Sequence, residues 1–211
     1  MTAAVASLIG LRAHMSRAHS GGGEWPDGPV FTVDWLTHVV EVWDAHLGAF
    51  RGRPGVRFLE VGSYEGGSAV WLCRNILTGV GSTLTCVDPF DVRWEGRFDH
   101  NIAASGVADR VVKLKGRSQD VVRALPRVET FDFVYVDGCH HPECVLADSV
   151  LCFDLLKVGG LIMWDDYEFV DPPDQPGEAV DAFLVVYRRH LDVVHRDYSV
   201  LARKTSPAYP W

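Results

Sequence analysis

The period of the hydrophobic positions changes repeatedly along the chain, and these changes predict alternating strands and helices. Continuous apolar runs such as 56–61 and 131–136 are typical of strands buried on both faces of a sheet. Apolar residues spaced three and four positions apart, as in 34–50, are typical of helices. We expect strands at 56–61, 83–87, 110–114, 131–136, 161–164, 191–195 and 198–202, and helices at 34–50, 68–77, 98–105, 119–125, 143–156 and 178–190.

This order of elements indicates an α/β fold. Strands joined through helices pair in parallel, and the helices then cover both faces of the sheet. Only Arg196 and Asp197 separate the last two expected strands, which is too short for a crossover, so these strands should form an antiparallel hairpin. We therefore predict a Rossmann-like, mostly parallel seven-stranded sheet with an antiparallel C-terminal hairpin and helices on both faces.

Composition and charge narrow the range of partners. The 211 residues include 20 Lys and Arg against 28 Asp and Glu, a net charge of −8. This acidity disfavours nucleic acid, and no apolar run reaches the roughly 18 residues that span a bilayer. The odd number of cysteines does not fit a disulfide framework, and no basic stretch precedes the apolar residues 3–11 as it would in a secretory signal. We expect a cytoplasmic protein with a small-molecule partner, no nucleic-acid partner and no membrane partner; the sequence leaves a homo-oligomer open.

Two loops that follow predicted strands carry the first chemical signal. Ligands of open α/β sheets lie beyond the carboxyl ends of the strands. The first loop is glycine-rich, but Glu60 stands where a dinucleotide fingerprint has its first glycine. An acid there repels pyrophosphate and suits a cationic ligand, while Asp88, at the end of the second strand, can accept hydrogen bonds from ribose. Each loop alone could be an ordinary turn, but together they favour a nucleoside.

Longer motifs resemble known enzymes. Residues 60–70, EVGSYEGGSAV, resemble the first motif of catechol O-methyltransferase, a class I S-adenosylmethionine-dependent methyltransferase. Residues 116–120, GRSQD, resemble its adenine-contacting segment. The chain from 135 to 167 is similar to the bacterial family of macrocin-type sugar O-methyltransferases and cephalosporin-hydroxylase-like proteins, whose pattern is Asp-Gly-x-His, a helix, Leu-Lys-x-Gly-Gly and Asp-Asp-Tyr. The resemblance covers roughly residues 56–190.

The resemblance implies S-adenosylmethionine as the cofactor and assigns residues to it. Glu60 would lie near the ammonium group, Gly62 and Ser63 under the methionine moiety, Tyr64 and Ser68 at its carboxylate, Asp88 at the ribose, Ser118 and Gln119 beside the adenine, and Asp137 and Cys139 in the same pocket. It also divides the chain into a class I methyltransferase domain at 51–211 and an N-terminal helical segment at 1–50 that covers the active site.

Three carboxylates at the ends of neighbouring predicted strands indicate a metal site. Asp137, Asp165 and Asp166 would repel one another without a cation, and oxygen ligands with open positions suit Mg²⁺. In the related O-methyltransferases the corresponding positions bind Mg²⁺ and substrate hydroxyls. The alternative is that Asp165 and Asp166 cap a turn after the strand. A zinc site in the segment 139–144 is disfavoured, because its ligands crowd together without a separate second pair.

A base beside such a metal would complete the chemistry of methyl transfer. A metal lowers the pKa of an acceptor hydroxyl, and a nearby base takes its proton. His140 and Asp137 are the predicted catalytic residues, with His140 as the base because imidazole titrates near neutral pH; His141 is the alternative base. The aromatic side chains that could cover the ligands are Trp25, Trp35 and Trp94, and the segment 168–177 could be a lid over the acceptor.

These features favour a Mg²⁺-dependent O-methyltransferase. It would transfer a methyl group from S-adenosylmethionine to a hydroxyl of a small molecule, such as a natural-product sugar, a diol or a phenol. Three alternatives remain open at this point: a metal-independent N-methyltransferase acting on a small molecule, a member of the fold with hydroxylase-like or lyase-like chemistry, and a non-catalytic protein that binds S-adenosylmethionine.

Overall fold

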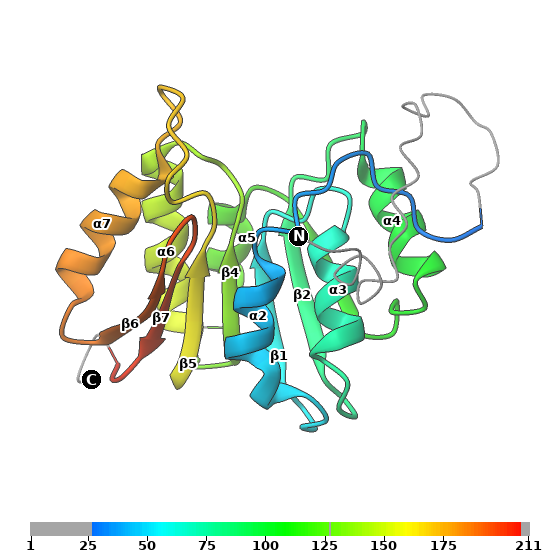
Figure 1. The fold of residues 1–211 in the computed structure, drawn as a ribbon, viewed down its shortest axis with the longest axis horizontal. Helices are drawn as coiled ribbons and strands as arrows, with labels where there is room; N and C mark the ends of the chain where they lie inside the picture. The colour runs from blue at the N-terminus through cyan, green and yellow to red at the C-terminus, as the bar shows by residue number, and fades with distance from the viewer. Residues whose placement is uncertain (1–26, 127, 208–211) are drawn as a thin grey trace.

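A seven-stranded sheet forms the centre of the computed structural model, which describes residues 27–126 and 128–207. The strands are β1 (Arg57–Val61), β2 (Thr83–Asp88), β3 (Val111–Lys115), β4 (Phe131–Val136), β5 (Leu156–Trp164), β6 (Leu191–Arg196) and β7 (Val200–Lys204). Their order in the sheet is β3-β2-β1-β4-β5-β7-β6 (Figure 1). The first five strands pair in parallel, whereas β7 is antiparallel to both β5 and β6. The predicted sheet and its antiparallel C-terminal hairpin are therefore confirmed.

Helices cover both faces of this sheet, as predicted. They are α2 (Val40–Leu47), α3 (Gly67–Asn75), α4 (Glu95–Ala104), α5 (Ser118–Ala124), α6 (Pro142–Leu155) and α7 (Pro176–Tyr187), with a short 3₁₀ turn at Gly48–Phe50. Helices α2, α3 and α4 share one apolar cluster with the sheet, and α5, α6 and α7 share the other. None of the helices within residues 27–126 and 128–207 is long and apolar enough to cross a membrane.

The side chains of the central strands alternate between these two clusters. In β1, Phe58 packs on the α2–α4 side, while Leu59 and Val61 pack on the α5–α7 side. Both sets are fully buried, because a parallel sheet covered on both faces has no solvent-facing side. This explains why the central strands appear in the sequence as continuous apolar runs.

The described part of the N-terminal segment packs into the same core. Trp43 of α2 is 1% exposed, contacts the rings of Trp71 and Tyr135, and donates its indole N–H to the sulfur of Met163 at 3.2 Å. Residues 1–26 lie outside the described residues. The helix expected at 34–50 is shorter than predicted: it begins at Val40.

Another boundary was placed wrongly at the end of α6. The apolar period predicted a helix through Leu156 and a strand from 161 to 164, but β5 begins at Leu156, which pairs with Phe131 of β4. The pairing resumes only at Phe133 and Leu161, so residues 157–160 form a bulge within the strand. Periodicity counted Leu156 as helical because its apolar side chain fits both patterns; the pairing with β4 decides between them.

Candidate active site

Loops from the carboxyl edge of the sheet surround a cavity of about 590 Å³. It lies where the chains leaving β1, β2 and β4 meet the start of α5 and residues 31–36 of the N-terminal segment. Nine of the ten predicted cofactor residues line it: Gly62, Ser63, Tyr64, Ser68, Asp88, Ser118, Gln119, Asp137 and Cys139. The tenth, Glu60, is fully buried at the end of β1. The structure thus brings the whole predicted set together.

Gly62 allows the loops after β1 and β4 to approach closely. Its φ of +88° lies in the left-handed region, and a Cβ atom there would stand 2.0 Å from the carbonyl oxygen of Asp137. The amide of Asp137 in turn donates to the carbonyl of Val61 at 2.8 Å. Glycine at this position therefore brings Asp137 against the cofactor loop.

Glu60 is a buried acid that is only half satisfied. Its Oε2 accepts a hydrogen bond from the hydroxyl of Ser63 at 2.6 Å, whereas its Oε1 has no hydrogen-bond partner among the described residues. Burial raises the pKa of Glu60 to about 6. A buried carboxylate with an unpaired oxygen beneath a ligand cavity is suited to a cationic group.

Asp88 shapes the cofactor loop as well as facing the cavity. Its Oδ2 accepts hydrogen bonds from the amides of Ser63 at 2.9 Å and Tyr64 at 3.2 Å, and its Oδ1 accepts one from the amide of Phe90 at 2.6 Å. A carboxylate has about four lone-pair positions, so these contacts leave acceptor capacity for a ligand hydroxyl. The sequence indicated only the second of these two roles.

The start of α5 contributes polar side chains to the cavity wall. Ser118 and Gln119 line it, and the hydroxyl of Ser118 donates to Oδ2 of the buried Asp148 at 3.0 Å. The rings of Tyr64 and Trp94 lie 5.1 Å apart, centroid to centroid, and both also line the cavity. A wall that combines polar side chains with aromatic rings suits an amphipathic ligand such as a nucleoside.

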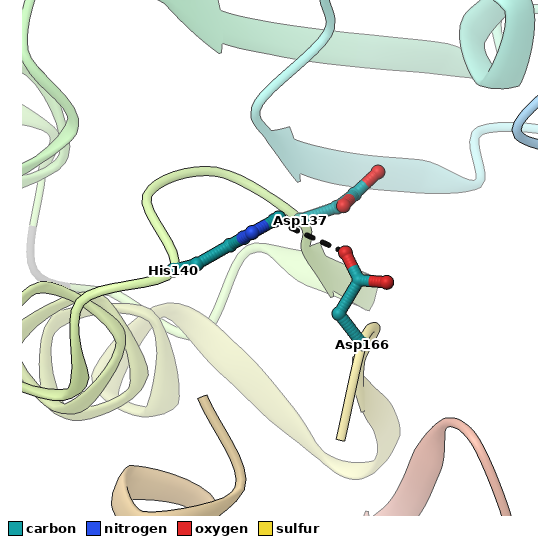
Figure 2. Close-up of side chains that lie close together, drawn as sticks. All are labelled: Asp137, His140 and Asp166. Carbon is teal, nitrogen blue, oxygen red and sulfur yellow. Dashed lines mark ion pairs between the residues drawn. The ribbon is translucent and has the colours of Figure 1, made fainter. Parts of the chain in front are cut away.

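Carboxylates from the ends of β4 and β5 gather beside the cavity. Potential ligand atoms of Asp137, His140 and Asp166 all lie within 4.8 Å of one another (Figure 2). The Nε2 atom of His140 is 3.0 Å from Oδ2 of Asp166. Burial raises the pKa of Asp137 well above its usual range, and the negative charges of Asp165 and Asp166 raise it further. A divalent cation would relieve this repulsion, so the donor set fits a metal ion that prefers oxygen ligands.

The third predicted metal ligand, Asp165, has other partners in this structure. Its side chain is 4% exposed; both of its oxygens lie 3.0 Å from Nε2 of His38, and its Oδ2 accepts the hydroxyl of Tyr135 at 2.5 Å. The tight group of possible ligands therefore contains His140 in place of Asp165. The two adjacent aspartates each pair with a histidine, Asp165 with His38 and Asp166 with His140.

Hydrogen bonding sets the protonation of these histidines. The hydrogen bond to Asp165 raises the pKa of His38, and the hydrogen bond to Asp166 raises the pKa of His140, in both cases against burial. Burial acts to raise the pKa of Asp166, but hydrogen bonds from His140 and Tyr198 outweigh it and lower the pKa. The neighbouring aspartate thus stabilises the protonated form of each histidine relative to the neutral form.

The remaining candidates are distributed around this cluster. His141, the alternative base, lies 3.3 Å from Asp174, measured from Nδ1 to Oδ1. The expected lid at 168–177 contacts His140: the amide of Gln175 donates to its carbonyl at 3.2 Å, and the ring of Phe169 lies 5.2 Å from its imidazole. Trp35 lines the cavity, while Trp25 lies outside the described residues.

Sequence reasoning missed three side chains of this site. His38, Tyr135 and Tyr198 lie on the N-terminal segment, in a buried strand and in the C-terminal hairpin turn. His38 and Tyr198 lie outside every motif, and Tyr135 stands at the start of the stretch 135–167 without a motif position of its own, so no local signal marked these side chains as partners of the aspartates. All five cysteines are free, and Cys73, Cys86 and Cys152 are fully buried.

Comparison with known proteins identifies the class. Residues 59–167 match the model of a family described as a methyltransferase domain. The chain belongs to this methyltransferase family, and its sheet is the one found in class I S-adenosylmethionine-dependent methyltransferases, as the resemblance implied. A comparison with curated protein sequences found no match.

Several solved structures share the fold. The O-methyltransferase TomG from Streptomyces achromogenes, in complex with S-adenosylmethionine, is 21% identical with a TM-score of 0.58, covering 71% of this chain and 73% of TomG. An O-methyltransferase from Bacillus cereus is 18% identical with a TM-score of 0.59, covering 80% of this chain and 89% of that one. MycE from the mycinamycin biosynthetic pathway, in complex with Mg, S-adenosylhomocysteine and mycinamycin VI, is 18% identical with a TM-score of 0.61, covering 85% of this chain and 52% of MycE.

Proposed function

We propose that this protein transfers a methyl group from S-adenosylmethionine to a hydroxyl group of a small molecule. A divalent cation, Mg²⁺, would be held by Asp137, Asp165 and Asp166, and His140 would be the base. The acceptor would be a hydroxylated natural product such as a sugar, a diol or a phenol. One observation carries the proposal: Asp137 lines the cofactor cavity and also belongs to the carboxylate cluster.

The shared position of Asp137 matters because methyl transfer needs two reactants side by side. The acceptor oxygen must approach the methyl carbon from the side opposite to the departing sulfur. A ligand in the cavity and an acceptor on the carboxylate cluster would meet at Asp137. Glu60 and Asp88 support the cofactor assignment, since buried acids suit a nucleoside that carries a sulfonium and an ammonium group.

His140 would remove the acceptor proton. A bound Mg²⁺ would lower the pKa of a hydroxyl that contacts it and hold the hydroxyl in one direction. The imidazole of His140 would take the proton, and Asp166, 3.0 Å from its Nε2, would stabilise the imidazolium that forms. The acceptor oxygen would then form the new C–O bond with the methyl carbon of S-adenosylmethionine, while the C–S bond breaks and its electron pair stays on sulfur.

The ligands bound to two structural neighbours agree with this assignment. MycE was crystallised with Mg, S-adenosylhomocysteine and mycinamycin VI, and TomG with S-adenosylmethionine. Both share only the fold with this chain, so they support the class of reaction and leave the acceptor open. The oxygen acceptor is favoured over nitrogen because a carboxylate-bound cation is most useful for activating a hydroxyl.

Calorimetry and metal removal together test the proposal. The protein should bind S-adenosylmethionine, and its methyl transfer to a panel of phenols, catechols and sugars should stop in EDTA and return with Mg²⁺. Asp165→Ala should weaken metal binding and keep cofactor binding, while Asp88→Ala should do the reverse. Full activity in EDTA would point to the metal-independent N-methyltransferase, and a His140→Ala variant that keeps most of the wild-type rate would remove His140 as the base.

A further inference from the structure

His38 joins the carboxylate cluster from a part of the chain that the family match does not include. It lies in the turn that precedes α2, whereas the match begins at residue 59. Its Nε2 atom is 3.0 Å from each oxygen of Asp165, although 127 positions separate the two residues along the chain. The ring of Tyr198 meets the imidazole edge-on, with centroids 5.4 Å apart and planes at 84°.

The direction of this hydrogen bond follows from the chemistry of its partner. An ionised carboxylate can only accept, so Nε2 of His38 must carry the hydrogen and donate it. Asp165 also accepts from the hydroxyl of Tyr135. These two donors occupy part of its acceptor capacity and leave lone pairs for a cation, because a carboxylate has about four lone-pair positions.

Buried hydrogen bonds hold the segment that carries His38 in place. The amide of Val30 donates to Oδ1 of Asn101 at 2.6 Å, and Nδ2 of Asn101 donates back to the carbonyl of Val30 at 2.8 Å. The amide and the hydroxyl of Thr32 donate to the two carboxylate oxygens of the buried Glu65, at 2.7 and 2.6 Å. The position of His38 therefore does not depend on its contact with Asp165 alone.

We infer that His38 is a positioning residue for the metal site: it orients the carboxylate of Asp165 by hydrogen bonding and thereby raises the affinity for the divalent cation. This inference rests on the proposed function, because it takes Asp165 as a metal ligand. It adds a contribution from the N-terminal segment to a site whose other members come from the methyltransferase core. Removal of such an outer partner typically lowers metal affinity by about 10–100-fold.

Titration of the full-length protein with Mn²⁺, followed by electron paramagnetic resonance, tests this role without any acceptor. His38→Ala should raise the Kd for Mn²⁺ by about 10–100-fold. His38→Gln, which keeps an N–H donor on a side chain of similar reach, should recover part of the loss. His46→Ala is the matched control, since His46 lies on α2 beside His195 and has no place in the cluster, so its Mn²⁺ affinity should equal that of the wild type.

Calorimetry with S-adenosylmethionine separates the outcomes. All three variants should bind it as the wild type does. If His38→Ala binds Mn²⁺ as tightly as the wild type, the positioning role is overturned while the proposed function stands. If the wild type binds S-adenosylmethionine but no Mn²⁺, the metal part of the proposed function fails, and the role of His38 fails with it. If His38→Ala and His38→Gln lose both ligands equally, the histidine is merely structural, which also overturns the inference.

Discussion

Replacing Glu60 by glutamine should change the stability of the cofactor-free protein in a pH-dependent way. The folded protein holds the pKa of Glu60 at about 6, against an ordinary value of 4.5, because the side chain is fully buried. As the pH rises, the unfolded chain releases this proton before the folded one does. The contribution of Glu60 to stability is therefore most favourable below about pH 4.5, falls as the pH rises to about 6, and stays lower above that.

The size of this effect follows from the difference in pKa. A difference of about 1.5 corresponds to roughly 2 kcal/mol, since one pKa unit is about 1.36 kcal/mol. Glutamine stays neutral, so the variant does not lose this stability as the pH rises. The gap in unfolding free energy between variant and wild type should thus grow by about 2 kcal/mol between pH 4.5 and 7.5. Any constant effect of packing the amide cancels in this comparison.

Urea unfolding at a series of pH values, without cofactor, measures the gap directly. The same substitution at Glu41, exposed on α2, measures the effect of losing one acidic charge at the surface. A gap at Glu60→Gln that stays constant from pH 4.5 to 7.5 would refute the reasoning. Calorimetry adds an opposite expectation: affinity for S-adenosylmethionine should fall about 10–100-fold, because a charged hydrogen bond contributes roughly 1.5–3 kcal/mol. A variant with a general folding defect would instead lose both unfolding free energy and affinity for S-adenosylmethionine.

Three further substitutions test the way the site is built. Gly62→Ala should lower the unfolding free energy by on the order of 3 kcal/mol in urea, because its Cβ would meet a carbonyl oxygen; Gly81→Ala, also at positive φ but with nothing within 4 Å, should lose clearly less. Asp88→Ala should raise the Kd for S-adenosylmethionine at least about tenfold in calorimetry, since three backbone amides of the cofactor loops lose their acceptor. Its Mn²⁺ binding should stay unchanged. An unchanged Kd for S-adenosylmethionine would contradict the role of Asp88. Glu65→Ala should lower the free energy of unfolding by about 3–5 kcal/mol, because Arg97 is left buried without its partner. Unfolding at the wild-type urea midpoint would disprove this.

Where the sequence predicted the fold well, local patterns and tertiary structure agree. The strand at 131–136 has the bounds predicted for it, since a continuous apolar run between polar turns has few other interpretations. The helix expected at 34–50 was placed less well: apolar spacing continues through the turn before Val40, which the α-helix does not include. The spacing of apolar residues shows only which side chains are buried. A turn that packs against the core can have the same spacing as a helix, so this spacing cannot separate the two.

In the candidate site, too, local patterns predicted some features and only packing decided the others. Motif spacing placed acids at the ends of β1, β2, β4 and β5, and the structure gathers them at one edge of the sheet. The partners of those acids could not be predicted. His38 and Tyr198 come from opposite ends of the described chain and reach Asp165 and Asp166 only through packing. Likewise, only the loop geometry shows that Asp88 accepts three backbone amides.

The sequence by itself determined the order of strands and helices, the direction of each strand and the carboxylates at the strand ends, because each depends on residues close together in the chain. Only the tertiary structure decided which carboxylate pairs with which histidine, and which side chains wall the cavity. Asp165 and Asp166 are neighbours in sequence, yet one turns to His38 and the other to His140. That choice depends on the positive φ of Asp166 and on elements that meet across the sheet, which no local pattern records.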